Sequence, residues 1–425
     1  GSAPLLMDSR YVIIADDLTG ANDTGIQFLK AGYSSSVVLD SGALRDLGAG
    51  EAAVLDTESR NIPEREAAAV LEKALPHLAP LKGKGIFFKK VDSTLRGNIR
   101  AETAVLRNGL EFSLTVFAPS YPGNRRTAVN GVLLLDGVPV AETEMARDPR
   151  KPALTSSLAE CLQGREAAEV RTVSLDEIRG GMVPAILESS GFRGTFCFDG
   201  ETEADLGLIA GGVLASVPAE EVLWVGSAGL AGALVSAPRP VLLVVASLSP
   251  GSAFQARHVI DRGLAAPVHA DIGGLLTDGP AEAERLAREA AALLRRGRNV
   301  LLASSLEERQ VEAGRNADAG ERISAVLADA VSRVLAACGT GGVFVTGGEA
   351  AIHVVRALGG RGTSLVGEVE AGIPLVRLLG GPLEGLPLIT KAGGFGGPET
   401  MERCIAVLSS CRGKKNSKNE VTAGS

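Results

Sequence analysis

Two adjacent acids, Asp16 and Asp17, follow an apolar run at residues 11–15, and small polar residues come directly after them. Carboxylates at the end of a strand suit a polar substrate or Mg²⁺, and such a group can accept a proton from a reacting hydroxyl. A second interpretation is that one Asp, or Thr19, caps the helix that follows. The pair on its own leaves both interpretations open.

A second charged segment, at residues 89–98, has the sequence KKVDSTLRGN. Side chains alternate along a strand, so Lys90 and Asp92 are expected on one face, with Arg96 four residues further on. Opposite charges on a buried sheet face are costly unless they are paired or hold a ligand. The segment therefore predicts either a substrate site or a structural Lys–Asp ion pair. Arg60, which follows the preceding strand, is expected to face the same site.

The second half of the chain carries glycine and serine, rather than charged residues, where its apolar runs end. Glycine lets backbone N–H groups close on an anion, and helix N-termini favour negative charge. Any one such turn is usually ordinary strand–helix chemistry, but several together predict a site for a nucleotide polyphosphate. The candidate residues are Ser249, Gly347, Gly348, Glu349, Ala350 and Gly393.

Short strands that alternate with helices must position these residues. Apolar runs rich in Val, Ile and Leu alternate with Ala-rich helical stretches, which is typical of βαβ units and mostly parallel sheets. Ligands bind at the carboxyl ends of strands in such sheets, where all the candidates fall. The expected strands are 11–15, 36–39, 52–56, 85–91, 114–118, 195–198, 222–225, 240–246, 267–270, 299–303, 342–346 and 387–390.

The chain is long enough, at 425 residues with 45% hydrophobic content, for two domains with buried cores. The segment Ser-Ala-Pro-Arg-Pro at residues 236–240 is the expected connector, because proline disfavours helix in the residue before it. We predict an N-terminal domain at residues 8–236 and a C-terminal domain at 238–412. The polar residues 413–425 are expected to be a disordered tail.

Composition excludes several classes of protein. A net charge of −7 without a basic stripe argues against nucleic-acid binding, and the longest apolar run, near residues 241–248, is too short for a bilayer. Five cysteines without a C-x-x-C pair predict a cytoplasmic protein with reduced thiols. The four histidines lack metal-ligand spacing, so no protein-held metal is expected. The P-loop, dinucleotide and protein-kinase motifs are absent.

Longer motifs resemble those of the four-carbon acid sugar kinase family. ADDLTGANDTG at residues 15–25 and KKVDSTLRGNI at 89–99 are similar to its two N-terminal motifs. GSAGLA at 226–231, TGGE at 346–349 and TKAGGFG at 390–396 follow in the family order, and the resemblance extends from about residue 11 to 405. It implies two α/β domains with mostly parallel sheets, one for a sugar acid and one for ATP, facing across an inter-domain cleft.

The resemblance implies a cytoplasmic kinase that moves the γ-phosphoryl group of ATP to the 4-hydroxyl of a small sugar acid. Mg²⁺ is expected to arrive as MgATP. Within the family the chain is most similar to kinases of D-threonate, with D-erythronate and 3-oxotetronate as alternative substrates. Ala246 and Ala350 stand where the family usually has Gly and Thr, which bears on the nucleotide contacts.

Asp17 and Asp92 are the catalytic candidates. Asp17 is preferred as the group that orients the hydroxyl and accepts its proton, because Asp16 is expected to hold the turn and Lys90 to neutralise Asp92. The residues expected to bind the acid are Asp16, Arg60, Lys90 and Arg96.

The sequence also bears on two rival functions and on the oligomeric state. A sugar-acid-binding protein that has lost catalysis is the rival from another class, and the intact motifs in both halves argue against it. A dehydrogenase is disfavoured because the dinucleotide fingerprint is missing. A homodimer is compatible with the sequence, which leaves the oligomeric state open.

Overall fold

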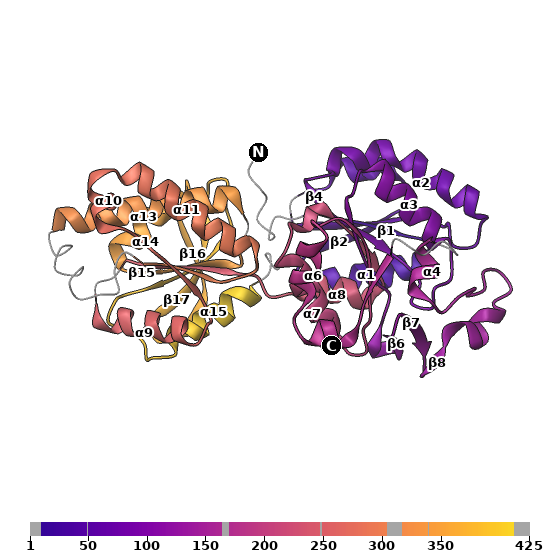
Figure 1. Cartoon of the computed structure of the whole chain (residues 1–425). Helices are drawn as coiled ribbons and strands as arrows, with labels where there is room; N and C mark the ends of the chain where they lie inside the picture. Colours follow the sequence, from indigo (N-terminus) through magenta and orange to yellow (C-terminus); the bar gives the residue numbers. More distant parts are fainter. Residues whose placement is uncertain are drawn as a thin grey trace, which may run out of the picture. The chain divides into compact units, whose positions relative to one another are not determined.

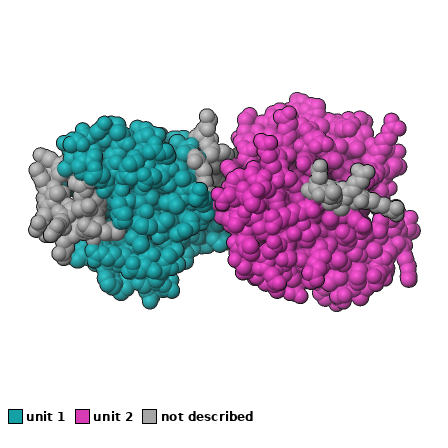
Figure 2. All heavy atoms as spheres, in the orientation of Figure 1, with its two compact units in different colours: residues 1–7, 238–412 teal, residues 8–237, 413–425 magenta. Residues whose placement is uncertain are grey.

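The computed structural model describes residues 10–48, 50–163, 170–246, 249–303, 317–338 and 340–411. These residues form two compact units, one that ends at Ala237 and one that begins at Pro238 (Figure 1 and Figure 2). The predicted tail at 413–425 lies outside the described residues. Among the helices that the structure describes, none is both long and apolar enough to cross a membrane.

The N-terminal unit is built on an eight-stranded sheet with the order β2-β3-β1-β4-β11-β5-β10-β9. Every strand pair in it is parallel. The central strands are continuous apolar runs because parallel sheets are covered on both faces. The strands are β1 (Arg10–Ala15), β2 (Ser34–Val38), β3 (Glu51–Asp56), β4 (Gly85–Lys90), β5 (Leu114–Ala118), β9 (Val170–Val173), β10 (Gly194–Phe198) and β11 (Val222–Gly226).

Helices connect these strands in the βαβ manner, and a small antiparallel sheet extends the unit (Figure 1). The helices are α1 (Leu18–Lys30), α2 (Glu64–Leu78), α3 (Ile99–Gly109), α4 (Leu158–Gln163), α5 (Leu175–Arg179), α6 (Val183–Ser189), α7 (Glu203–Leu214) and α8 (Ala228–Ser236). The small sheet comprises β6 (Arg126–Val129), β7 (Val132–Leu135) and β8 (Val138–Pro139).

The C-terminal unit has a seven-stranded sheet with the order β13-β14-β12-β15-β18-β17-β16, in which the last two strands run antiparallel to their neighbours. The strands are β12 (Val241–Val245), β13 (Ala266–His269), β14 (Val300–Ala303), β15 (Gly342–Thr346), β16 (Gly362–Glu370), β17 (Ile373–Leu379) and β18 (Pro387–Lys391). The helices are α9 (Pro250–Asp261), α10 (Ile272–Thr277), α11 (Gly279–Arg295), α13 (Ala317–Ala337), α14 (Gly348–Ala357) and α15 (Thr400–Ser410).

The predicted fold class, mostly parallel α/β, is confirmed, and the expected strands end within one or two residues of the observed ones. The hairpin of β16 and β17 was not expected. Strand β16 is largely exposed and lacks a continuous apolar run, so the pattern typical of a buried parallel strand is missing there.

A buried ion pair fixes the carboxyl end of β4 to helix α3. Lys89 Nζ lies 2.8 Å from Glu102 Oε2, and both side chains are almost completely buried. Ser59 Oγ donates to Glu102 Oε1 at 2.5 Å. Glu102 therefore connects β4 to the loop after β3, and Arg60, the next residue in that loop, is held close to the strand ends.

Candidate active site

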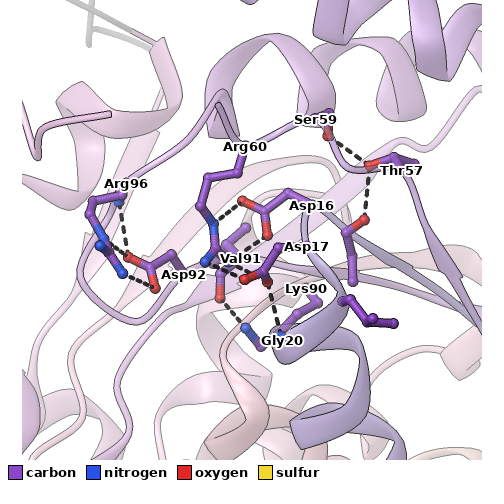
Figure 3. Close-up of polar contacts among 12 residues, drawn as sticks. Asp16, Asp17, Gly20, Thr57, Ser59, Arg60, Lys90, Val91, Asp92 and Arg96 are labelled. Carbon is purple, nitrogen blue, oxygen red and sulfur yellow. Dashed lines mark hydrogen bonds and ion pairs between the residues drawn. The ribbon is translucent and has the colours of Figure 1, made fainter. Parts of the chain in front are cut away.

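The charged residues of the N-terminal unit meet at one edge of its sheet (Figure 3). Strands β3, β1 and β4 are neighbours, and their carboxyl ends lead into Arg60, Asp16–Asp17 and Lys90 respectively. Asp17 is also the N-cap of α1, where its side chain accepts a hydrogen bond from Gly20 N at 2.9 Å. The capping interpretation is therefore confirmed for Asp17, and the site interpretation stays a prediction.

Arg60 joins the two adjacent acids through four hydrogen bonds (Figure 3). Its Nε and Nη2 donate to Asp16 Oδ2 and Oδ1 at 2.9 and 2.8 Å, and its Nη1 and Nη2 donate to Asp17 Oδ2 and Oδ1 at 2.7 Å. Burial by itself lowers the pKa of Arg60, but the hydrogen bonds and charges of the acids raise it above its usual range. One guanidinium N–H, on Nη1, stays available for a ligand.

Lys90 is buried and donates a hydrogen bond from Nζ to Val91 O at 2.8 Å. It forms no ion pair with a carboxylate of the described residues, and burial lowers its pKa while the charges of Asp16 and Asp92 act in the opposite direction. An ammonium has three N–H donors, so Lys90 keeps donors for an anionic ligand. A Cβ at Gly20 would lie 3.0 Å from Nζ, so glycine leaves the room that Lys90 occupies.

The predicted neutralisation of Asp92 by Lys90 is wrong. Asp92 Oδ2 accepts from Arg96 Nε at 2.8 Å, and Thr94 Oγ1 donates to the same oxygen. Burial by itself raises the pKa of Asp92, but Arg96 and the charge of Arg60 lower it to about 2. The alternation rule fails here because β4 ends at Lys90, and Asp92 belongs to the loop that follows.

A distant segment completes this loop and was not found from the sequence. Asp148 Oδ2 accepts from Arg96 Nη1 at 2.8 Å, and Lys151 Nζ donates to Asn98 Oδ1 at 2.6 Å. Gly97, with φ of 104°, lies between these contacts, and a Cβ there would be 2.8 Å from Asp16 Oδ2. The loop after β4 is therefore held by the segment at residues 148–151 through hydrogen bonds, and it packs closely against Asp16 at Gly97.

Asp16, Asp17 and Asp92 differ in the solvent exposure of their side chains. The side chains of Asp16 and Asp92 are 2% and 12% exposed, whereas that of Asp17 is 23% exposed. Asp16 is thus mainly a structural partner of Arg60, and Asp17 offers the most accessible carboxylate to a ligand.

Asp56, the last residue of β3, is a buried acid that sequence analysis did not single out. Its Oδ1 accepts from Glu58 N at 3.0 Å, and its Oδ2 has no partner among the described residues. Burial raises its pKa to about 6, and the charges of Glu58 and Asp17 add to this effect. The folded state therefore holds this proton more tightly than the unfolded chain does.

Asp56→Asn is expected to stabilise the N-terminal unit above pH 6, where the wild-type carboxylate is charged and buried. The penalty vanishes below the unfolded pKa of 3.8 and is complete above the folded value of about 6, which corresponds to up to about 3 kcal/mol. Trp224, the one tryptophan of the chain, is buried in β11 and reports on this unit. Urea unfolding followed by the fluorescence of Trp224 should show a gain in stability at pH 8 that is several times larger than the gain at pH 4. An equal gain at both pH values would contradict this assignment.

The glycine- and serine-rich turns of the C-terminal unit also gather at one sheet edge, because β12, β15 and β18 are neighbours. Ser249 caps α9 by accepting from Ser252 N at 3.2 Å, and its Oγ donates to Gly393 O at 2.8 Å. Gly347 has φ of 109° and precedes α14, which places Gly348 and an exposed Glu349 in the first turn of that helix.

The remaining candidates differ in exposure. Ala350 is buried against the core of the unit, so its methyl group packs rather than faces solvent. Gly393 is half-buried in the turn after β18. Four neighbours of these turns were not selected from the sequence, although two of them, Thr346 and Lys391, lie in the motifs TGGE and TKAGGFG. The missed residues are Ser252, Gln255, Thr346 and Lys391.

Comparison with known proteins covers both units. A family model for a sugar-binding N-terminal domain matches residues 11–234, and one for a nucleotide-binding C-terminal domain matches residues 242–401. The chain is 34% identical to a D-threonate kinase of Salmonella typhimurium, over 92% of this chain and 96% of that protein. It is 28% identical to a D-erythronate kinase of Heliobacterium modesticaldum, over 94% and 97% of the two chains.

A solved structure gives the same result for the fold. The crystal structure of a Bordetella bronchiseptica domain of unknown function, a domain-swapped dimer with bound citrate, superposes with a TM-score of 0.55 at 30% identity. The match covers 96% of this chain and 100% of that one. Both domain models and full-length relatives therefore agree with the motifs in each unit, and the chain belongs to the four-carbon acid sugar kinase family.

Proposed function

We propose that this protein transfers the γ-phosphoryl group of ATP to the 4-hydroxyl of D-threonate. The observation that carries the proposal is the cluster of Arg60, Lys90, Asp16 and Asp17 at one sheet edge, in a chain similar to D-threonate kinases along its whole length. D-Erythronate and 3-oxotetronate are the alternative acids, since kinases of both are also relatives.

The N-terminal domain, residues 8–236, is proposed to bind the acid. Lys90 has donors to spare and no carboxylate partner among the described residues, so it suits the substrate carboxylate, and the remaining N–H of Arg60 adds a second charge-assisted bond. Arg96 is held by Asp92 and Asp148 and would orient the loop beside the acid. Citrate in the related Bordetella structure is a small carboxylic acid, which supports an anion site in such proteins.

Asp17 is proposed to orient the 4-hydroxyl and accept its proton. Arg60 holds both Asp16 and Asp17, and Arg96 holds Asp92, but the side chain of Asp17 is the most exposed of the three acids. Phosphoryl transfer depends mainly on positioning and charge neutralisation, so an oriented acceptor hydroxyl is the main requirement on this side.

The C-terminal domain, residues 238–412, is proposed to bind the nucleotide through Ser249, Gly347, Gly348, Glu349, Ala350 and Gly393. The phosphates fit the turns between β12, β15 and β18, where glycines and a helix N-terminus offer N–H groups. Mg²⁺ would come with ATP, because the acids of the N-terminal cluster are held by arginines.

A phosphorylation screen tests the substrate. Purified protein with MgATP is given D-threonate, L-threonate, D-erythronate and 3-oxotetronate, and ADP release is followed. D-Threonate is expected to have a kcat/KM at least about tenfold above the others, because an acid with even one hydroxyl inverted or replaced by a ketone leaves a polar partner unpaired, which costs about 1.4 kcal/mol or more. Phosphorus NMR of the product should place the phosphate on O4.

Other results of the screen would favour another substrate or a protein without catalytic activity. A higher kcat/KM for D-erythronate or 3-oxotetronate would transfer the proposal to that acid. Binding of ATP and acid without ADP release would indicate a catalytically silent sugar-acid-binding protein. We further propose a homodimer in the cytoplasm, where ATP is supplied, and sedimentation analysis of the purified protein tests the dimer.

A further inference from the structure

Lys391, the last residue of β18, is a buried cation at the centre of the C-terminal sheet edge. Its side chain is 2% exposed, and it forms no ion pair with a carboxylate in the part of the chain that the structure describes. Instead Nζ donates to the backbone carbonyls of Ala392, Gly393 and Phe395 at 3.1, 3.1 and 3.0 Å. Buried charges are normally paired, so this ammonium is expected to find its counter-charge in a ligand.

Gln255 of α9 holds the same turn from the other side. It is 2% exposed, and its Nε2 donates to the carbonyls of Phe395, Gly396 and Gly397 at 3.2, 3.1 and 2.9 Å. Its Oε1 has no partner among the described residues, so these carbonyls satisfy only the amide nitrogen. Gly393 O accepts two more bonds, from Ser249 Oγ and Ser252 Oγ at 2.8 and 3.2 Å.

These contacts turn the carbonyl oxygens of the turn at 392–397 inward. The C=O and N–H groups of a trans peptide point in opposite directions, so the N–H groups that follow these carbonyls point outward. The outward set is Gly393, Gly394, Gly396 and Gly397, and none of the four donates a backbone hydrogen bond to another described residue. A Cβ added at Gly394 or Gly397 would meet nothing within 4 Å, which leaves open space on that side.

We propose that Lys391 and Gln255 are positioning residues that shape this turn into a cradle for the polyphosphate of the nucleotide. The three N–H groups of the ammonium are engaged by three carbonyls, so Lys391 acts through the peptides rather than by touching phosphate. Hydrogen bonds in a chain polarise one another, so the positive charge strengthens the outward N–H donors. This inference rests on the proposed nucleotide site and adds the residues that create its charge and shape.

Calorimetric titration with adenosine, AMP, ADP and MgATP tests the cradle. Lys391→Met keeps the length of the side chain and removes its charge. Its affinity for ADP and MgATP is expected to fall about tenfold or more, with a smaller loss for AMP and none for adenosine, since each phosphate bond is charge-assisted. The KM for the sugar acid should stay unchanged. Lys82→Met, which removes a partly buried lysine of the N-terminal unit, is the matched control and should leave all four affinities unchanged.

Gln255→Met tests the inference independently, because it keeps the charge and releases the carbonyls of Gly396 and Gly397. An affinity loss of about three- to tenfold that again grows with the number of phosphates supports the cradle. Unchanged MgATP affinity in both variants would overturn it, as would equal losses for adenosine and MgATP, which indicate a purely structural role. If the wild-type protein bound no nucleotide, the proposed kinase function itself would be wrong. The wild-type titration therefore distinguishes failure of the proposed function from failure of the cradle alone.

Discussion

Asp17→Asn is expected to lower kcat by about 10²–10⁴-fold, the usual contribution of a general base, with the affinity for ATP kept. The substitution removes the negative charge and leaves the local fold intact. Asn caps helices as well as Asp does, so the hydrogen bond from Gly20 N and the start of α1 are retained. Arg60 also keeps its paired bonds to Asp16.

Steady-state kinetics with saturating D-threonate and MgATP measure this effect. Asp40→Asn is the matched control, because Asp40 is another capping aspartate of the same unit and lies in an exposed turn. It should leave kcat unchanged. If Asp17→Asn stayed within a few-fold of wild type while Asp92→Asn abolished turnover, the proton acceptor would be Asp92 and Asp17 would be a cap only.

The strands could be predicted because buried parallel strands carry their signal locally. Residues 11–15 and 114–118 are short apolar runs that lead directly into polar turns, and they end where the structure ends β1 and β5. The location of the candidate site could be predicted from the same strands, since parallel strands place their carboxyl ends together. Asp16, Asp17, Arg60 and Lys90 were therefore brought together correctly.

Partner choice within the site could not be predicted, because it depends on where each strand ends and on segments far away in the sequence. Asp92 pairs with Arg96 since β4 stops at Lys90, a matter of one or two residues that alternation cannot resolve. Asp148 contacts Arg96 although the two residues are 52 positions apart, and nothing in the local sequence of Asp148 marks it. The burial of Lys391 is likewise a property of the folded turn alone.

Arg60→Ala is expected to be more damaging than the loss of either acid, because it leaves two adjacent carboxylates without their shared cation. Removing one partner of a buried ion pair typically costs about 3–5 kcal/mol, and Asp16 is almost fully buried. The kcat/KM for D-threonate should also fall by about 10²–10³-fold, since the loss includes a bond to the acid and the orientation of Asp17. Nucleotide affinity, which we assign to the C-terminal unit, should be unchanged.

Arg60→Lys separates the two contributions. Lysine keeps the positive charge but cannot make two forked pairs, so we expect it to restore most of the stability and little of the acid affinity. The fluorescence of Trp224 during urea unfolding measures the stability of this unit, and calorimetry with D-threonate measures the affinity. Wild-type unfolding of Arg60→Ala would mean that Asp16 and Asp17 do not depend on Arg60. Full acid affinity in Arg60→Lys would mean that charge alone, rather than the forked geometry, serves the substrate.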